Sequence, residues 1–221
     1  MEPTTLSDPR FAVLLYKNVL PKELDIVSRL ESTIGDSTTM PFMWCEALVG
    51  YSQKMPEYRD CVDCKIGTTH LEHLHRFPQF VELNNIYNDT ATAIRKCMDD
   101  YQSRYNINMQ YMEAINFIRY KANQHFQVHT DHGFSYTCTV SSVAYFNDDY
   151  QGGELWFPYL DLTIKPEAGD IVMFPSTFIY AHAAKPVISG IKYSAVTMFD
   201  YNDRNHDIKG SHDGVKAPLN Q

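Results

Sequence analysis

The sequence predicts an α+β fold with a mainly β core, in which N-terminal helices support an antiparallel β structure. Two helical patterns precede residue 110, the period of the apolar residues then changes to two, and short strands follow one another up to about residue 201. Many short strands at close spacing are typical of a sandwich or a barrel. Because no repeat or linker divides the 221 residues, we expect a single domain.

Two segments predict helices. In segment 21–34 the apolar residues recur three or four positions apart, which places them on one face of a helix, and Pro21 suits a first helical position. Segment 80–105 has a longer pattern of the same kind and contains neither Gly nor Pro. The stretch 35–78 between them shows no clear pattern.

The predicted strands are short, rich in β-branched and aromatic residues, and bounded by Asn, Asp, Gly or Pro. They are expected at Gln110–Tyr120, Tyr136–Phe146, Glu154–Phe157, Asp161–Ile164, Asp170–Phe174 and Lys192–Phe199. We therefore divide the chain into helical support and variable loops (1–109), a β core (110–201) and a polar tail or lid (202–221).

Composition restricts the function. Acidic residues number 27 against 19 basic ones, and the formal charge of -8 is the wrong sign for holding nucleic acid or anionic lipid. Apolar runs are too short to span a membrane, no secretory leader pattern opens the chain, and an odd set of five Cys suits reduced thiols. We therefore expect a cytoplasmic protein without nucleic-acid or membrane partners. Nine His among many carboxylates indicate a metal site.

The tripeptide His129-Thr130-Asp131 is the strongest metal signal. In an extended chain alternate side chains share a face, so His129 and Asp131 can reach one ion. His182, which follows a predicted strand and a short loop, is the best candidate for a third ligand. Two His and one carboxylate bind iron(II) on one side and leave the other side open to substrate and oxygen.

The motifs downstream of this tripeptide have a characteristic order. They are Phe146-Asn147-Asp148, Gly152-Gly153-Glu154-Leu155-x-Phe157, Pro166-x-x-Gly169-Asp170-x-x-x-Phe174-Pro175 and His182-x3-Pro186-Val187-x2-Gly190-x-Lys192-Tyr193. In this order and spacing, over residues 115–200, the chain resembles the 2-oxoglutarate and iron(II)-dependent dioxygenases, within them the prolyl 4-hydroxylase-like branch. The resemblance implies a double-stranded β-helix (jelly roll) core.

The resemblance also implies roles for five residues. His129, Asp131 and His182 would be the iron ligands, Lys192 would pair with the far carboxylate of 2-oxoglutarate, and Tyr120 would hydrogen-bond the same carboxylate. The physical argument agrees for the lysine, because a buried anion must meet a cation and a lysine is almost never fully buried without a partner. Without the motif, a lysine whose amine reaches solvent from the strand end would be the ordinary interpretation.

The reaction implied is hydroxylation of a C–H bond coupled to decarboxylation of 2-oxoglutarate, with release of succinate and CO2. Iron(II), 2-oxoglutarate and O2 would be required, and ascorbate is the expected reductant. The expected substrate is a prolyl residue in a peptide or protein. Two alternatives stay open: the same chemistry on a free amino acid or other small molecule, and a non-catalytic jelly-roll module that binds metal. The oligomeric state is left open.

Three positions depart from the pattern of this branch. Many members have Gly at the position of Asn123, Thr at that of Leu155 and Trp at that of Met198. The last two departures leave the finer cosubstrate contacts and the specificity for peptidyl proline open. Asp131 is a carboxylate, whereas the halogenating members have a small residue there, so hydroxylation is favoured over halogenation.

Other metal-type residues have simpler interpretations. Cys61 and Cys64, followed by His70, His73 and His75, could bind zinc, but the spacing fits no common finger, and a surface loop is favoured. In a regular strand His125 would share the face of His129 but lie about 13 Å away, too far to be a ligand. His132 is expected to point away from the metal, and His206 and His212 to be solvated in the tail.

Overall fold

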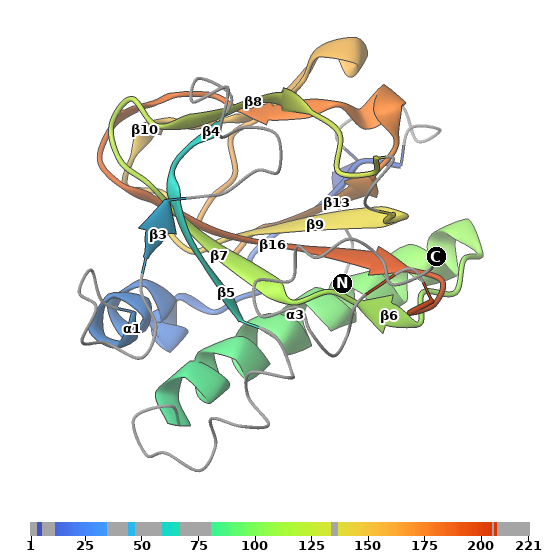
Figure 1. Cartoon of the computed structure of the whole chain (residues 1–221), viewed down its shortest axis with the longest axis horizontal. Coiled ribbons are helices and arrows are strands. Elements are labelled where there is room, and N and C mark those ends of the chain that lie inside the picture. Colours follow the sequence, from blue (N-terminus) through green and yellow to red (C-terminus); the bar gives the residue numbers. More distant parts are fainter. Residues whose placement is uncertain are drawn as a thin grey trace.

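The computed structural model describes residues 4–5, 12–34, 44–46, 59–66, 81–133, 137–204 and 206. Two antiparallel sheets face each other, and helices cover the outer side of the larger sheet (Figure 1). From residue 111 onward the described chain consists mainly of strands, and further strands lie before residue 110. Within these residues, no helix is long and apolar enough to cross a membrane.

The larger sheet has nine strands. Along its path lie β1 (Thr4–Thr5), β2 (Leu14–Tyr16), β13 (Ile171–Pro175), β9 (Val140–Tyr145), β16 (Lys192–Asp200), β7 (Ile115–Tyr120), β5 (Val62–Ile66) and β3 (Cys45–Glu46), and β6 (Tyr111–Met112) pairs with β16 beside this path. The predicted strands are all present here or in the smaller sheet. Strands β1, β2, β3 and β5 come from before residue 110, where no strand was predicted.

The smaller sheet has five strands and lies across the larger one (Figure 1). Its order is β12 (Leu162–Ile164), β11 (Leu155–Phe157), β14 (His182–Ala184), β8 (His125–His129) and β4 (Arg59–Asp60). A separate pair, β10 (Gln151–Gly152) with β15 (Val187–Ser189), lies beyond its end.

Alternation along the strands of the larger sheet builds two apolar cores. In β9, Val143 and Tyr145 face the smaller sheet, whereas Val140 and Ala144 face the helices. The same division repeats in β2, β13 and β16. Because both faces are buried, these strands are mainly apolar, and polar residues within them such as Ser141, Ser142 and Lys192 are buried as well. The interior between the sheets is closed on its helix side.

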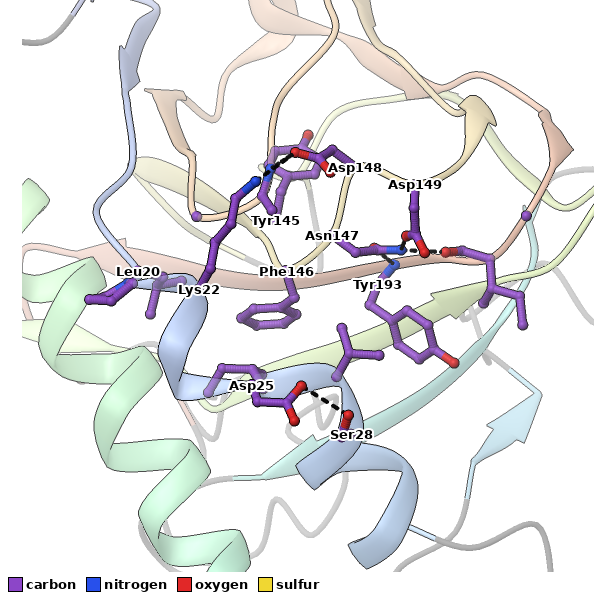
Figure 2. Close-up of a pocket in the computed structure, with 17 residues that line it drawn as sticks. Leu20, Lys22, Asp25, Ser28, Tyr145, Phe146, Asn147, Asp148, Asp149 and Tyr193 are labelled. Atoms are coloured by element: carbon purple, nitrogen blue, oxygen red, sulfur yellow. Dashed lines mark hydrogen bonds and ion pairs between the residues drawn. The ribbon is translucent and has the colours of Figure 1, made fainter.

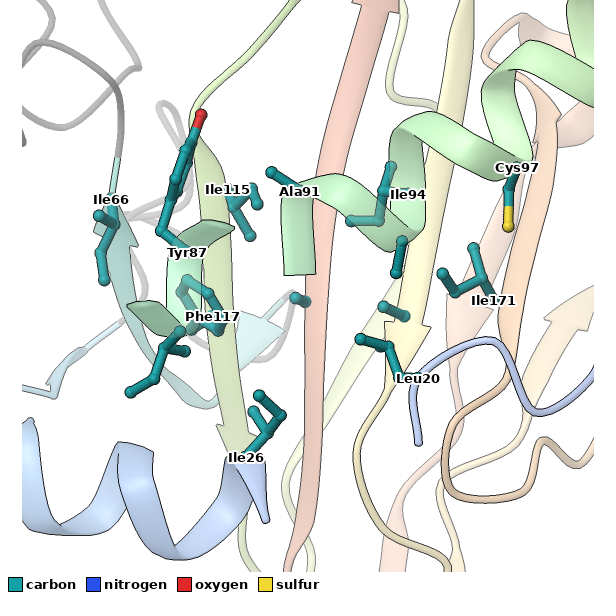
Figure 3. Close-up of a cluster of buried hydrophobic side chains, with 14 of the residues drawn as sticks. Leu20, Ile26, Ile66, Tyr87, Ala91, Ile94, Cys97, Ile115, Phe117 and Ile171 are labelled. Atoms are coloured by element: carbon teal, nitrogen blue, oxygen red, sulfur yellow. The ribbon is translucent and has the colours of Figure 1, made fainter. Parts of the chain in front are cut away.

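The helices form the outer layer. They are η2 (Lys22–Leu24), α1 (Ile26–Thr33) and α3 (Val81–Tyr105), close to the predicted segments. Figure 3 shows how α3 packs on the larger sheet through Ala91, Ile94 and Cys97, opposite Ile115 and Ile171. On the outer side, Arg29 of α1 pairs with Glu82 and Asp89 of α3. The helix layer thereby holds the sheet that forms one wall of the interior.

Candidate metal centre

The three predicted ligands meet in the interior between the sheets. His129 ends β8, His182 begins β14, and the two residues lie directly opposite each other. Asp131 lies two residues beyond β8; its Oδ1 is 3.5 Å from Nε2 of His129 and its Oδ2 is 3.7 Å from Nε2 of His182. One potential ligand atom from each residue lies within 4.8 Å of the others. The arrangement could therefore hold one metal ion.

A bulge in β8 sets the direction of His129. His182 pairs with His129 and Ala184 pairs with Phe126, so β8 has one residue more than β14 between the two pairs. Residues opposite each other across strands point to the same side, so Phe126 and His129 both face inward although they are three apart. Their rings stack with centroids 3.6 Å apart.

Backbone carbonyls hold both imidazoles. Nδ1 of His129 is 2.8 Å from the carbonyl oxygen of Gln127, and Nδ1 of His182 is 3.1 Å from that of Tyr180. In a neutral imidazole, a proton on Nδ1 leaves the lone pair of Nε2 available. Both Nε2 atoms are therefore the ones that face Asp131, in the orientation usual for a metal-binding histidine.

Burial and charge favour the ligand forms of these groups. Burial lowers the pKa of His182 to about 4, which keeps the imidazole neutral. For Asp131, burial alone would raise the pKa, but His182, His129 and the hydroxyl of Ser141 outweigh it and hold the pKa below its ordinary value. Phe157 and Phe174 lie beside His182 and exclude water from it.

Lys192 of β16 and Tyr120 of β7 are cross-strand partners, and both are buried. The side chain of Lys192 is 2% exposed, and its Nζ donates to the carbonyl oxygen of Gly153 at 2.6 Å. Nζ also lies 5.1 Å from the centroid of the Tyr120 ring. Burial lowers the pKa of Lys192 to about 8, against the attraction of Glu154. The hydrogen bond to a neutral carbonyl leaves the positive charge able to meet an anion.

Two more buried tyrosines lie near the Lys192 side chain. Tyr145 and Tyr150 are buried, and their hydroxyls have no hydrogen-bond partner within the described residues. Nζ of Lys192 lies 5.3 Å from the Tyr145 ring. At Gly153, where φ is +67°, a Cβ would come within 3.1 Å of Lys192 and 3.2 Å of Tyr150. The glycine gives both side chains the room they occupy.

Residues 115–200 match the family model described as the 2OG-Fe(II) oxygenase superfamily. A PKHD-type hydroxylase of Crocosphaera subtropica is 31% identical over 103 residues, which are 41% of this chain and 44% of that protein. The resemblance found in the sequence, to the prolyl 4-hydroxylase-like branch of this superfamily, is confirmed. The chain spans about half the length of the curated relatives that it matches.

Solved structures share the fold of this chain. A prolyl-4-hydroxylase from Pseudomonas putida has a TM-score of 0.63 at 14% identity and covers 88% of this chain and 95% of its own. A Trichoplax adhaerens prolyl hydroxylase, in complex with a hypoxia inducible factor oxygen degradation domain peptide fragment, has a TM-score of 0.62 at 14% identity, with 86% and 84% coverage. The predicted fold class, a mainly β jelly roll supported by helices, is confirmed.

The family implies Fe(II), 2-oxoglutarate and O2, and the residues present fit them. Two imidazoles and one carboxylate are a donor set that suits Fe(II). A buried ammonium group beside two buried hydroxyls without partners suits the far carboxylate of 2-oxoglutarate. Both observations come from this chain and do not depend on the relatives.

Sequence reasoning missed several residues of the site. Ser141 donates to Asp131, Phe126 stacks on His129, and Tyr150 lies beside Lys192. The inward direction of Ser141 follows from the alternation of β9, but nothing in one sequence distinguishes a serine that contacts a ligand from a serine in the core. The position of Phe126 depends on the bulge, which has no sequence signal here.

Three expectations about other residues were wrong. His125 does not share the face of His129, because the bulge intervenes between them. Cys61 and Cys64 are not in a surface loop: both are buried, on opposite sides of the sheet, so they do not face one ion together. His206 is buried instead of solvated. His70, His73, His75 and His212 lie outside the described residues.

A cavity of 590 Å³ lies on the helix side of the larger sheet, separate from the three candidate ligands. Figure 2 shows that its polar side chains pair with one another: Lys22 with Asp148, and Asp25 with Ser28. Its lining residues do not include a candidate ligand. The chemistry of the chain is therefore assigned to the interior between the sheets.

Proposed function

We propose that this chain is a 2-oxoglutarate- and Fe(II)-dependent dioxygenase that hydroxylates a C–H bond and releases succinate and CO2. The observation that carries the proposal is the joint placement of two histidines and one carboxylate with a buried lysine in one interior. A structural metal site would need the three ligands but not the lysine. A buried lysine near buried hydroxyls that have no hydrogen-bond partner within the described residues is explained by an anionic cosubstrate that binds there.

In this proposal His129, Asp131 and His182 would hold Fe(II). The bound metal would supply activation of O2, of which one atom goes to the substrate and the other to succinate as 2-oxoglutarate is oxidised and loses CO2. The protein contributes the orientation of the ligands and the exclusion of water. The carbonyl groups of Gln127 and Tyr180 keep each Nε2 directed at the ion. The aromatic rings around His182 keep bulk water away from the reacting centre.

Lys192 and Tyr120 would anchor 2-oxoglutarate by its far carboxylate. A charge-assisted hydrogen bond in a dry site is stronger than a neutral one, so the ammonium group would give most of this anchoring energy. Tyr145 and Tyr150 would add two neutral donors. Together they would fix the depth at which the cosubstrate enters and so align its 2-oxo acid end with the ligands.

We infer that the substrate is a prolyl residue in a peptide or protein. The support is the similarity to a PKHD-type hydroxylase and to the folds of prolyl hydroxylases, one of which is solved with a peptide. Ascorbate would serve as the external reductant. The net charge of -8 argues against nucleic acid as the substrate.

The proposal is tested by measuring succinate formed from 2-oxoglutarate with Fe(II) and ascorbate, with and without a proline-rich peptide. We expect turnover that the peptide stimulates, with hydroxylated product detected by mass spectrometry. His129→Ala should reduce coupled turnover by at least about a hundredfold, because it removes a ligand. His125→Ala, which changes the same residue type on the same strand, is the control and should keep most of the activity.

Two results would contradict the proposal in different ways. Absence of turnover together with absence of bound Fe(II) would exclude every dioxygenase assignment. Metal-dependent turnover that no peptide stimulates would keep the chemistry and exclude the prolyl assignment, in favour of a free amino acid or another small molecule.

A further inference from the structure

Two serines connect the candidate ligand Asp131 to the larger sheet. The hydroxyl of Ser141 donates to Oδ2 of Asp131 at 2.6 Å, and Oγ of Ser141 lies 2.8 Å from Oγ of Ser176. Both serine side chains are buried. Water therefore has no access with which to replace either bond if one partner is removed.

The direction of this chain of hydrogen bonds follows from proton counting. A serine hydroxyl has one proton, and an ionised carboxylate can only accept. The Ser141 hydroxyl lies 2.6 Å from Oδ2 of Asp131 and donates its only proton there. Ser176 must then donate to Ser141. The order is Ser176 to Ser141 to Asp131.

Backbone hydrogen bonds hold Ser176, the first residue in this chain of hydrogen bonds. The N–H of Ser176 donates to the carbonyl oxygen of Thr139 at 3.0 Å, and its own carbonyl accepts from the N–H of His132 at 3.1 Å. Ser176 follows β13, Thr139 precedes β9, and His132 follows Asp131 directly. The hydroxyl chain and these two bonds join the loop that carries Asp131 to two strand ends.

We infer that Ser141 and Ser176 are positioning residues that fix the orientation of the Asp131 carboxylate for the metal. This inference rests on the proposed function, because it assumes that Asp131 is a ligand. With Oδ2 held by Ser141, the carboxylate cannot turn about its last bond without losing a buried hydrogen bond. Loss of a hydrogen-bond partner of a ligand typically weakens metal binding about 10- to 100-fold.

The chain provides a matched control. Ser142 is also fully buried in β9, but it points to the helix side of the sheet, and its hydroxyl has no hydrogen-bond partner within the described residues. Ser141→Ala and Ser142→Ala each delete one buried hydroxyl from adjacent positions. Only the first deletion removes a contact with Asp131.

The test is titration of the metal-stripped full chain with Co(II) by calorimetry, together with the visible absorption spectrum of bound Co(II). We expect Ser141→Ala to weaken Co(II) binding about 10- to 100-fold and to alter the spectrum, and Ser142→Ala to stay within about threefold of the unaltered chain. Neither readout depends on turnover.

Ser176→Ala tests the order of the chain. It should weaken binding less than Ser141→Ala, and the double variant should bind as Ser141→Ala does, because Ser176 acts through Ser141. Circular dichroism establishes that each variant is folded. If Ser141→Ala does not fold, Ser176→Ala decides the matter, since it leaves the direct partner of Asp131 in place.

The outcomes distinguish a failure of this inference from a failure of the proposed function. Unaltered Co(II) affinity in folded Ser141→Ala, or in Ser176→Ala where the first variant does not fold, overturns this inference and leaves the proposed function standing. An additive loss in the double variant overturns the assigned order. Failure of the unaltered chain to bind Co(II) overturns the proposed function and this inference with it.

Discussion

At the scale of single residues, Lys192 shows how burial and chemistry compete. The ammonium group has lost water and gained a carbonyl oxygen, two aromatic rings and the distant attraction of Glu154. These contacts offset only part of the free energy lost by desolvation, so the pKa of Lys192 falls to about 8. In a protein selected for stability alone, an apolar residue would suit this position better. The lysine is therefore best explained by binding.

Lys192→Met tests this explanation. The substitution keeps the volume of the stem and removes the charge, so the free energy of unfolding should be unchanged or higher. The apparent KM for 2-oxoglutarate should rise about 10- to 100-fold, because a charge-assisted hydrogen bond is lost. Chemical denaturation and turnover at varied 2-oxoglutarate measure the two effects.

Lys185→Met is the matched control for Lys192→Met. Lys185 lies over the ring of Trp156, outside the interior. Its replacement should leave the KM for 2-oxoglutarate unchanged. A KM that is equal in both variants would show that Lys192 does not anchor the cosubstrate.

At the scale of elements, the turn between β7 and β8 explains a departure from the family pattern. Asn123, where many relatives have Gly, adopts φ of +70°, and its N–H donates to the carbonyl oxygen of Val187 at 2.7 Å. Asn tolerates this left-handed conformation better than other residues with a Cβ. Asn123 therefore suits the positive φ that this turn requires, and its hydrogen bond to Val187 connects the turn to β15.

The turn makes a stability prediction. Asn123→Gly should leave the free energy of unfolding within about 0.5 kcal/mol, whereas Asn123→Ala should lower it by about 1 kcal/mol, because Ala pays the full cost of positive φ. Urea unfolding followed by circular dichroism measures both. Equal stability of the Gly and Ala variants would contradict the assignment of strain to this turn.

Elements differ in how well the sequence predicted them. Strands β7, β9, β13 and β16 have long β-branched or aromatic runs, and all were expected. β8 has one aliphatic residue, Val128, and no clear hydrophobic period. β5 alternates Val62, Cys64 and Ile66 with Asp and Lys, but it is short and was not predicted as a strand. The positions of both strands follow from pairing with strands far away in the chain, which a local pattern does not contain.

At the scale of the whole molecule, His206 ties the end of the described chain to the sheet. Its Nδ1 is 2.6 Å from Oε1 of Glu113 and its Nε2 is 3.1 Å from Oδ2 of Asp200, while the Tyr111 ring stacks on it. Burial would lower the pKa of His206, but the two carboxylates outweigh burial and raise it. An imidazolium that donates to both carboxylates therefore holds the segment after β16.

The contacts of His206 with Glu113 and Asp200 predict that the free energy of unfolding depends on pH. Because the folded pKa is raised, the contribution is complete below the unfolded pKa of about 6.5 and is lost as pH rises through the folded pKa. His206→Gln should lower the free energy of unfolding by about 3 kcal/mol at pH 6, and by less at pH 9. His125→Gln is the control. If the free energy of unfolding changes with pH in the same way in His206→Gln and in the unaltered chain, the proposed role of His206 is contradicted.

The sequence predicted the residues whose roles follow from short spacings along the chain. It did not predict the residues whose roles depend on contacts between distant parts of the chain. The set His129, Asp131 and His182 was predicted from short spacings and family motifs, and the structure brings these residues together. His206 was misjudged because its polar neighbours resemble a tail, while its carboxylate partners lie 93 and 6 residues away in the chain. One long-range pair of this kind leaves no trace in local composition.

The bulge in β8 has a consequence for how this strand tolerates changes in length. Deleting Gln127 would remove the extra residue and let β8 pair with β14 without interruption. The shortened strand would form a regular ladder in which His129 stands two positions from Phe126, so both side chains would still face inward and His129 would still lie opposite His182. Deletion of Gln127 should therefore keep the His129 imidazole on the inner side, whereas deletion of one residue from a strand without a bulge would turn the following side chains to the other face. The bulge thus makes this point of β8 tolerant of a one-residue loss.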